Sequence, residues 1–200
     1  MSIDDHPLLR EGIATIIRAQ PDMDLVGQAA DARDGIRVYR EEKPDVTLMD
    51  LRLPDMNGID ALIAIRAEFV NARVIMLSTF QGDVDIQRAL AAGARGFLLK
   101  TMPPNELVAC IRQVHKGKKC VPADVAAHLA NYFAEEALTA REVEILELIA
   151  AGNRNRDVAD ALSISEDTVK VHVKHAMEKL GANDRTEAVV IAVRRGIIHL

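Results

Sequence analysis

Acidic, hydroxyl and basic side chains follow the short apolar runs in the first half of the chain, each at the point where a run ends. They are Asp4, Asp5, Asp50, Ser78 and Lys100. Carboxylates placed together repel one another unless a cation lies among them, and oxygen donors at a half-solvated site suit Mg²⁺. A carboxylate can attack a phosphoryl group when a metal ion and a lysine neutralise the phosphoryl oxygens. These residue types predict a phosphoryl-transfer site with Asp50 at its centre.

The side chains would meet only if the apolar runs are strands of one parallel sheet. From Ile3 to His115, short apolar runs alternate with longer amphipathic stretches, which is the pattern of β-α units. The expected strands end at Ile3, Gln28, Met49, Leu77 and Leu99. The expected helices are Leu8–Gln20, Asp34–Lys43, Gly58–Glu68, Val84–Ala91 and Asn105–His115. This order predicts a doubly wound α/β domain with a five-stranded parallel sheet, and ligands bind such sheets at the carboxyl ends of the strands.

Three longer segments surround the strand-end residues. They are Asp4-Asp5-His6-Pro7, Met49-Asp50-Leu51-Arg52-Leu53-Pro54-Asp55-Met56-Asn57-Gly58 and Gly93-Ala94-Arg95-Gly96-Phe97-Leu98-Leu99-Lys100. Together they closely resemble the receiver domain of response regulators, over Ile3 to about Lys116. The resemblance implies a flavodoxin-like fold, a sensor histidine kinase as partner and Mg²⁺ as cofactor.

The resemblance also implies a role for each residue of the site. Asp50 would be the phosphoacceptor and a metal ligand. Asp5 would bind Mg²⁺ directly, Asp4 mostly through water, and Arg52 through its backbone carbonyl oxygen.

Three further residues complete the implied site. Ser78 and Lys100 would hold the phosphoryl oxygens, and Phe97 would be the aromatic switch that turns inward after phosphorylation. Plain packing of the last strand is the alternative for Phe97, because phenylalanine has no hydroxyl group to lose on burial.

The first strand is shorter than the resemblance implies. Only Met1, Ser2 and Ile3 precede Asp4, whereas strands of about five or six residues are typical. Either the start is late or the receiver is weakened.

The pattern of β-α units ends after His115. Gly117-Lys118-Lys119 and Pro122 interrupt it, and every element after Glu136 has helical periodicity. We therefore expect a receiver domain over residues 1–116, a linker over 117–137 and an all-α domain over 138–200.

The last part of the chain predicts four helices with a helix-turn-helix arrangement. Thr139 and Glu142 form a capping box at a helix that begins at Ala140 and ends near Gly152. Ser165 is the expected N-cap of the third helix. The helices after the first are Arg156–Leu162, Glu166–Leu180 and Arg185–Arg195.

The third of these helices has two different faces. Its core face is expected to contain Val169, Val173, Ala176, Met177 and Leu180. Its other face contains Lys170, Val171, Lys174 and His175. Lysine reaches guanine edges or phosphates and valine meets a thymine methyl group, so this face is typical of a helix that enters the major groove. A solvated charged face is the alternative.

Two segments carry a second resemblance. Leu138-Thr139-Ala140-Arg141-Glu142 and Thr168-Val169-Lys170-Val171-His172-Val173-Lys174-His175 strongly resemble the LuxR-type DNA-binding domain, over Leu138 to about Ile198. With a receiver, they place the chain among the NarL/FixJ regulators. The resemblance implies contact of Lys170, Val171 and Lys174 with base edges of double-stranded DNA. It implies that Thr168, Asn155 and Arg185 lie near phosphates. It also implies a homodimer on DNA, built by the last helix through Val189, Val190 and Val193.

Composition limits the remaining function classes. The net charge is −5, and residues 138–200 have nine Lys and Arg against ten Asp and Glu, so DNA binding must depend on local clustering. Neither an export signal nor a membrane-spanning run is expected, which predicts a cytoplasmic protein without a membrane partner. Cys110 and Cys120 are expected to be reduced thiols.

Two rival functions remain to be weighed. A dehalogenase-like phosphatase would need a second aspartate two residues after Asp50, where Arg52 stands, so we expect no enzyme. The alternative function is a ligand-sensing LuxR-type regulator that phosphorylation does not control. An apolar ligand pocket favours aromatic side chains, which make up only 3% of the chain.

Overall fold

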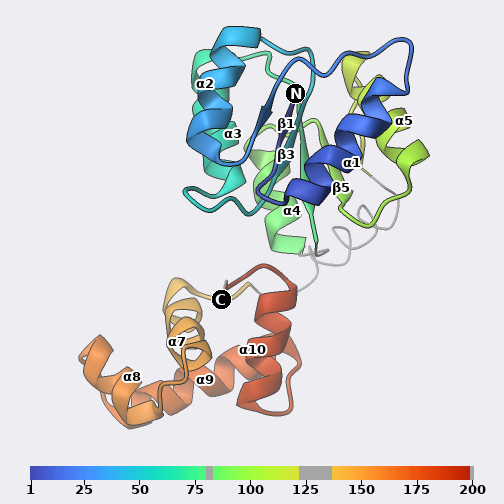
Figure 1. Ribbon diagram of the computed structural model, residues 1–200. Helices are drawn as coiled ribbons and strands as arrows, with labels where there is room; N and C mark the ends of the chain where they lie inside the picture. Colours follow the sequence, from blue (N-terminus) through green and yellow to red (C-terminus); the bar gives the residue numbers. More distant parts are fainter. Residues whose placement is uncertain (80–82, 122–136, 199–200) are drawn as a thin grey trace. The chain divides into compact units, whose positions relative to one another are not determined.

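The computed structural model describes residues 1–79, 83–121 and 137–198 of the 200-residue chain (Figure 1). The described residues form two compact units. The first contains residues 1–79 and 86–121, and the second contains residues 83–85 and 137–198.

The first unit is built on a five-stranded parallel sheet. Its strands are β1 (Ser2–Ile3), β2 (Gln28–Ala29), β3 (Thr47–Asp50), β4 (Val74–Ser78) and β5 (Gly96–Leu99), in the order β2-β1-β3-β4-β5. This is the flavodoxin-like order, so the predicted fold class is confirmed. The register pairs Ile3 with Met49, Asp50 with Leu77 and Ser78 with Leu99. The carboxyl ends of these strands are therefore almost level with one another.

Helices cover both faces of this sheet. The helices are α1 (Pro7–Arg18), α2 (Ala32–Glu42), α3 (Gly58–Glu68), α4 (Asp83–Ala91) and α5 (Pro104–His115). Helices α1 and α5 lie together on one face, and α2 and α3 lie on the other (Figure 1). The core between the sheet and α1 and α5 contains aliphatic side chains from both layers, among them Ile13, Ile17, Leu48, Leu77, Leu107 and Ile111.

Two helices begin at a proline, one residue before the start that their apolar periodicity indicated. Pro7 is the first residue of α1 and Pro104 is the first residue of α5. Proline is favoured there because the first-turn N–H that it lacks would have no partner within the helix. Helix α2 begins two residues earlier than expected, because Asp31 caps it by accepting the Asp34 N–H at 2.8 Å.

Strand β1 contains only two residues but pairs with strands on both sides. The pairing of β1 with β3 extends to the first residue of the chain, where the Leu48 N–H donates to the Met1 carbonyl oxygen at 3.0 Å. A cavity of about 450 Å³ lies beside this residue and is lined in part by Leu25, Val46 and Ile111. The short strand nevertheless places Asp4 directly beyond its carboxyl end.

The expectation of two reduced thiols is wrong for this structure. Cys110 of α5 forms a disulfide with Cys120, with their Cα atoms 5.6 Å apart, inside the usual range for a disulfide. The fold brings the two together because the chain turns back after α5 and runs beside β5. There the Phe97 N–H donates to the Cys120 carbonyl oxygen at 3.0 Å. Distance along the sequence could not show this pairing.

The linker prediction over residues 117–137 is only partly covered by the structure. Its first residues, 117–121, are described, and Cys120 forms a β-bridge with Gly96 of the first unit. Residues 122–136 lie outside the described residues.

The second unit contains α7 (Ala140–Ala150), α8 (Asn155–Leu162), α9 (Glu166–Leu180) and α10 (Arg185–Arg194). The predicted capping box is present: Thr139 Oγ1 accepts the Glu142 N–H, and the Glu142 carboxylate accepts the Thr139 N–H at 2.7 Å. Ser165 caps α9, as predicted. The helical character predicted for this part of the chain is confirmed. In the described part of the chain, no helix has the length and apolar character needed to cross a membrane.

Candidate functional site

A lysine and two aspartates meet at the carboxyl ends of the sheet strands. Lys100 Nζ lies 2.8 Å from Asp4 Oδ2 and 2.6 Å from Asp50 Oδ2. The side chains come from the ends of β5, β1 and β3, and all three are almost fully removed from solvent. Buried carboxylates are costly unless a cation accompanies them, and here the Lys100 ammonium supplies that charge.

The environment changes the pKa of both Asp50 and Lys100. Burial raises the pKa of the Asp50 carboxyl above its ordinary range, although the hydrogen bond from Lys100 opposes this effect. Burial by itself would lower the pKa of the Lys100 ammonium, but hydrogen bonds to Asp4 and Asp50 outweigh burial, so this pKa is raised. Lys100 therefore stays charged, and the site has a permanent positive group beside a poorly solvated carboxylate.

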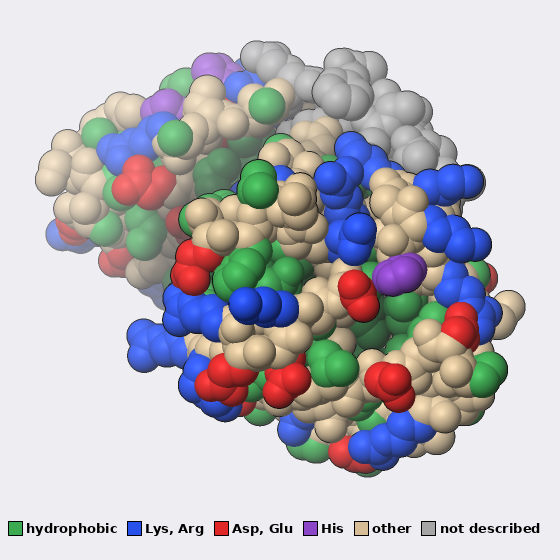
Figure 2. Space-filling view, turned by 90° about the horizontal axis from the view of Figure 1, so that it is seen from above, with side chains coloured by type: hydrophobic (Ala, Val, Ile, Leu, Met, Phe, Trp, Pro, Cys, Tyr) green, Lys and Arg blue, Asp and Glu red, His purple; other side chains and the backbone are tan. Residues whose placement is uncertain are grey.

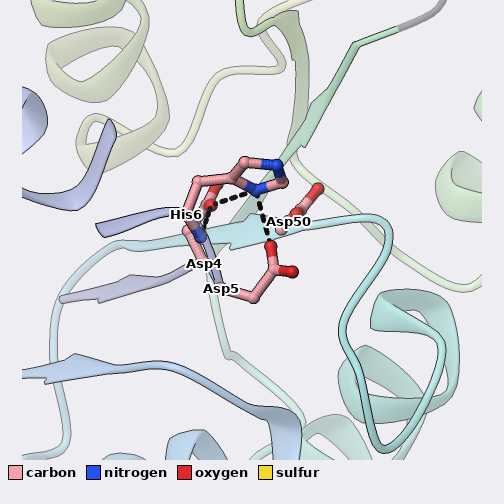
Figure 3. A group of neighbouring side chains, drawn as sticks. All are labelled: Asp4, Asp5, His6 and Asp50. Carbon is pink, nitrogen blue, oxygen red and sulfur yellow. Dashed lines mark hydrogen bonds and ion pairs between the residues drawn. The ribbon is translucent and has the colours of Figure 1, made fainter. Parts of the chain in front are cut away.

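Asp5 and His6 belong to the same cluster (Figure 3), and their side chains are 38% and 62% exposed. His6 Nδ1 lies 2.6 Å from Asp5 Oδ1 and 3.2 Å from Asp4 Oδ1. Asp4, Asp5, His6 and Asp50 each offer one donor atom, and these atoms lie within 4.8 Å of one another. A group of this size could hold one divalent cation. The predicted residues Asp4, Asp5 and Asp50 are thus brought together.

His6 is the member of the cluster for which the sequence predicted no role. The available signal was its position immediately after two candidate metal ligands and before the proline that starts α1. Histidine is a common metal ligand, so this adjacency could have identified it.

Three further predicted residues surround Asp50. Ser78 is buried at the end of β4, and its backbone carbonyl oxygen accepts the backbone N–H of Lys100 at 2.7 Å. The Arg52 N–H donates to Asp50 Oδ1 at 3.2 Å, which places this peptide beside the carboxylate. Phe97 on β5 is fully buried. The roles of the Ser78 hydroxyl, the Arg52 carbonyl and the Phe97 ring remain predictions.

The two faces of α9 are divided as the periodicity predicted. Val169 and Ala176 are buried, and Val173, Met177 and Leu180 pack against the same cores. The residues on the opposite face are exposed: Lys170, Val171, Lys174 and His175. Lys170 pairs with Asp167 at 2.8 Å and Lys174 with Glu178 at 3.7 Å. These pairs are highly exposed and contribute little stability, so both lysines can be redirected to a ligand at small cost.

The residues predicted near phosphates lie in two places. Arg185 Nη1 lies 3.4 Å from Asn155 Oδ1, and Arg185 Nη2 donates to the Asn153 carbonyl oxygen at 3.1 Å, so Asn155 and Arg185 are neighbours. Thr168 lies in the first turn of α9, where its hydroxyl is 2.8 Å from Ser165 Oγ. The structure thus brings Asn155 of α8 and Arg185 of α10 together.

The valines predicted at the dimer contact differ in exposure. Val190 of α10 is 43% exposed. Val189 and Val193 pack partly into the core of their own unit. Val190 is thus the most accessible of the three.

Surface charge is mixed on the face that Figure 2 shows. Lys and Arg side chains lie among Asp and Glu side chains there, with hydrophobic side chains between them. This agrees with the slightly negative net charge of the chain.

Two family models match separate parts of the chain. The response regulator receiver domain matches residues 1–112. The model of bacterial regulatory proteins of the luxR family matches residues 136–192. The first match covers more than half of the chain, and together they follow the two compact units.

Relatives with similar sequences match nearly the whole chain. The uncharacterized transcriptional regulatory protein YxjL of Bacillus subtilis (strain 168) is 40% identical, over 98% of this chain and 95% of YxjL. The transcriptional regulatory protein LiaR of the same organism is 38% identical, over 98% of this chain and 97% of LiaR.

Solved structures agree with these relatives. The response regulator ChrA of a heme-sensing two-component system is 34% identical, with a TM-score of 0.59 over 99% of this chain and 97% of ChrA. The response regulator RcsB in its DNA complex is 26% identical, with a TM-score of 0.72 over 96% of each chain. The chain therefore belongs to the two-component response regulators that join a receiver domain to a LuxR-type DNA-binding domain and regulate transcription.

Proposed function

We propose that a sensor histidine kinase phosphorylates Asp50 of this chain and that phosphorylation promotes binding of a homodimer to specific double-stranded DNA in the cytoplasm. The observation that carries the proposal is the position of Lys100 Nζ between the buried carboxylates of Asp4 and Asp50. Two carboxylates sharing one cation, with a third beside them, are suited to a divalent ion and a phosphoryl group.

The donor set fits Mg²⁺. Asp4, Asp5 and Asp50 offer carboxylate oxygens within reach of one ion, and the Arg52 backbone N–H donates to Asp50 Oδ1, which places residue 52 near the carboxylate. We assign these carboxylates and the Arg52 carbonyl oxygen as the ligands. The ion, when bound, neutralises negative charge on the phosphoryl oxygens.

The residues of the chain perform the transfer itself. An Asp50 oxygen forms a bond to phosphorus while the bond from phosphorus to the imidazole nitrogen of the kinase breaks. Lys100 holds one phosphoryl oxygen, and the Ser78 hydroxyl holds another. Phe97, which is already fully buried on β5, is assigned as the switch residue beside this group. The charged, buried lysine supports the first of these roles, because it needs no proton rearrangement to pair with the incoming group.

The second unit supplies DNA recognition. Lys170, Val171, Lys174 and His175 form the exposed face of α9 that enters the major groove, while Thr168, Asn155 and Arg185 contact phosphates. RcsB, to which this chain is similar, has been solved as a complex with DNA, and this supports the same partner for this chain. We assign dimer contact to α10 through Val190, with Val189 and Val193 beside it. We propose the receiver over residues 1–116, the linker over 117–137 and the DNA-binding domain over 138–200.

Phosphorylation of Asp50 is tested with acetyl phosphate and Mg²⁺. The wild-type chain is expected to gain one phosphoryl group by intact mass, with the acid-stable, base-labile behaviour of an acyl phosphate. Asp50→Asn should gain none. Asp60→Asn is the matched control, since Asp60 is an exposed aspartate on α3, and it should be labelled as the wild type is. Equal labelling of Asp50→Asn would overturn the assignment.

A further inference from the structure

Asp55 joins the loop that follows Asp50 to a second helix. This loop, residues 51–57, connects β3 to α3. The Asp55 carboxylate accepts the Ala32 N–H at 2.8 Å through Oδ1 and the Arg33 N–H at 3.0 Å through Oδ2. Both N–H groups belong to the first turn of α2, which lies beside α3 (Figure 1). One side chain therefore binds the tip of the loop to a helix 22 and 23 residues away in the sequence.

Asp55 adds a second carboxylate to a helix that already has a cap. The Asp31 side chain accepts the Asp34 N–H at 2.8 Å, and the Asp31 carbonyl oxygen accepts the Gly35 N–H at 3.0 Å. Negative charge is favoured at this end of a helix. Partial burial would raise the pKa of the Asp55 carboxyl, but the two N–H groups that it accepts outweigh burial and lower this pKa. The ionised carboxylate thus holds the loop against α2.

The same loop is held at its base. Arg52 and Asn57 form an antiparallel β-bridge, and the Gly58 N–H donates to the Leu51 carbonyl oxygen at 2.8 Å. A Cβ atom at position 58 would collide with the Asp50 carbonyl oxygen, so the loop folds back closely on the phosphoacceptor. With its base bridged and its tip bound to α2, the loop has little freedom to shift. Release of the tip would let the loop move about the bridge.

The base of the loop orients the Asp50 carboxylate. The Arg52 N–H donates to Asp50 Oδ1 at 3.2 Å, whereas Lys100 Nζ lies 2.6 Å from Asp50 Oδ2. The two oxygens have different partners on opposite segments, and together these partners fix the plane of the carboxylate. A shift of the Arg52 N–H would release Oδ1 and allow rotation about the Cβ–Cγ bond. Nucleophilic attack depends strongly on alignment, so this rotation would slow the reaction.

We propose that Asp55 is a positioning residue for the phosphorylation of Asp50 and acts by holding the Arg52 N–H against Asp50 Oδ1. This inference rests on the proposed function. Asp55 acts through the backbone of the loop and makes no contact with the phosphoryl group. A side chain that only stabilised α2 would be equivalent to Asp31, which accepts an N–H of the same helical turn. The two roles can therefore be separated.

The test compares phosphorylation rates of the full chain with acetyl phosphate and Mg²⁺. An Asp50 oxygen bonds to phosphorus while the bond from phosphorus to the acetyl oxygen breaks and acetate leaves. Asp55→Ala should lower the saturating rate by about tenfold or more, because the nucleophile is misaligned. The half-saturating acetyl phosphate concentration should change by less than about threefold, since Lys100 is untouched. Asp55→Asn keeps one oxygen acceptor, and its rate should fall between those of the wild type and Asp55→Ala.

Asp31→Ala is the matched control. It removes a carboxylate cap from the same end of α2 but leaves the loop unchanged, so it should phosphorylate at the wild-type rate. Hydrogen exchange of the Arg52 amide, followed by ¹⁵N nuclear magnetic resonance, reports the hydrogen bond to Asp50 directly. Exchange should be faster in Asp55→Ala than in the wild type and unchanged in Asp31→Ala.

Equal losses of rate in Asp31→Ala and Asp55→Ala would show that Asp55 only stabilises the helix, which rules the inference out. A wild-type rate in Asp55→Ala would do the same. Both results leave phosphorylation of Asp50 intact. If the wild type itself is not labelled at Asp50, the proposed function fails, and this inference fails with it.

Discussion

Lys100 holds two roles that compete with each other. In the folded chain it neutralises the buried carboxylates of Asp4 and Asp50, and in the proposed reaction it must turn to the phosphoryl group. A side chain that leaves both carboxylates would expose them to mutual repulsion unless a divalent ion takes its place. Metal binding and the release of Lys100 should therefore be linked.

Replacement of Lys100 by alanine should make folding depend on the metal. Without a divalent ion, Lys100→Ala is expected to lose about 3 kcal/mol, because it leaves buried carboxylates without a partner. Mg²⁺ should recover a large part of this loss, since a ligand that binds only the folded state stabilises it. Thermal unfolding with and without Mg²⁺ measures both effects. Lys116→Ala, at an exposed position, is the control, and a Mg²⁺ response of Lys100→Ala no larger than that of the control would contradict the linkage.

At the scale of elements, Glu142 connects two helices of the second unit. Its carboxylate accepts the Thr139 N–H at the start of α7 and also pairs with Lys179 of α9 at 3.0 Å. Burial would raise the pKa of this carboxyl, but the hydrogen bonds from Thr139 and Lys179 outweigh burial and lower it below its ordinary value of 4.5. The ionised form is thus favoured by folding.

The stability of the second unit should depend on pH through Glu142. A carboxyl whose pKa is lowered on folding stabilises the protein above its unfolded pKa, and this stabilisation disappears as the pH falls through the folded pKa. Glu142→Gln should therefore lower the melting temperature at neutral pH, and the difference from wild type should shrink below about pH 4.5. Glu144→Gln, at an exposed position on the same helix, is the control. A difference between Glu142→Gln and wild type that stays constant from neutral pH down to about pH 3 would refute the linkage.

The sequence predicted the elements more fully than the contacts between them. Periodicity located the strands and helices, because burial on one face leaves a regular pattern. It placed the start of α1 after Pro7, since proline carries no apolar signal although it suits the first helical turn. The disulfide depends on where the chain turns back after α5, and the approach of His6 to Asp5 depends on the local turn before α1; periodicity contains neither kind of information. Strand-end residues such as Asp50 were predictable because parallel strands deliver them to one edge.

At the scale of the whole molecule, the charge balance limits how DNA can be bound. The second unit has about as many acidic as basic residues, so general attraction to phosphate is weak. Lys170 and Lys174 lie one helical turn apart on the exposed face of α9, which suits one groove. Useful affinity should then require the second units of two chains, each bound to one of two half-sites about one DNA turn apart.

Substitutions on α9 should separate base contacts from phosphate contacts. If Lys170 or Lys174 contacts a base, its replacement by alanine should cost about 1 to 3 kcal/mol on the cognate site and relax the preference at one base pair. A lost phosphate contact should instead weaken all sequences alike and lower the slope of log K against log salt by about one unit. Val171→Ala should weaken a thymine-containing site without changing the slope.

Fluorescence anisotropy on a single half-site and on a paired site measures these effects. Lys118→Ala removes an exposed lysine outside the second unit and is the control. If both α9 lysine variants match this control on both DNAs, α9 is not the recognition helix.

The disulfide between Cys110 and Cys120 closes a loop that contains Lys116, Lys118 and Lys119, all of them exposed sites for trypsin. Cleavage at any of these lysines would break the peptide chain but leave its two parts joined through the sulfur atoms. Brief trypsin treatment should therefore yield a nicked protein that migrates as one band until a reductant is added, and then as two fragments. Separation without reductant would show that the sulfur atoms are not bonded in solution. A pulling force on the two ends of the chain would likewise be carried by the disulfide rather than by the peptide bonds of this loop. The loop could therefore be cut or lengthened without detaching the residues that follow it.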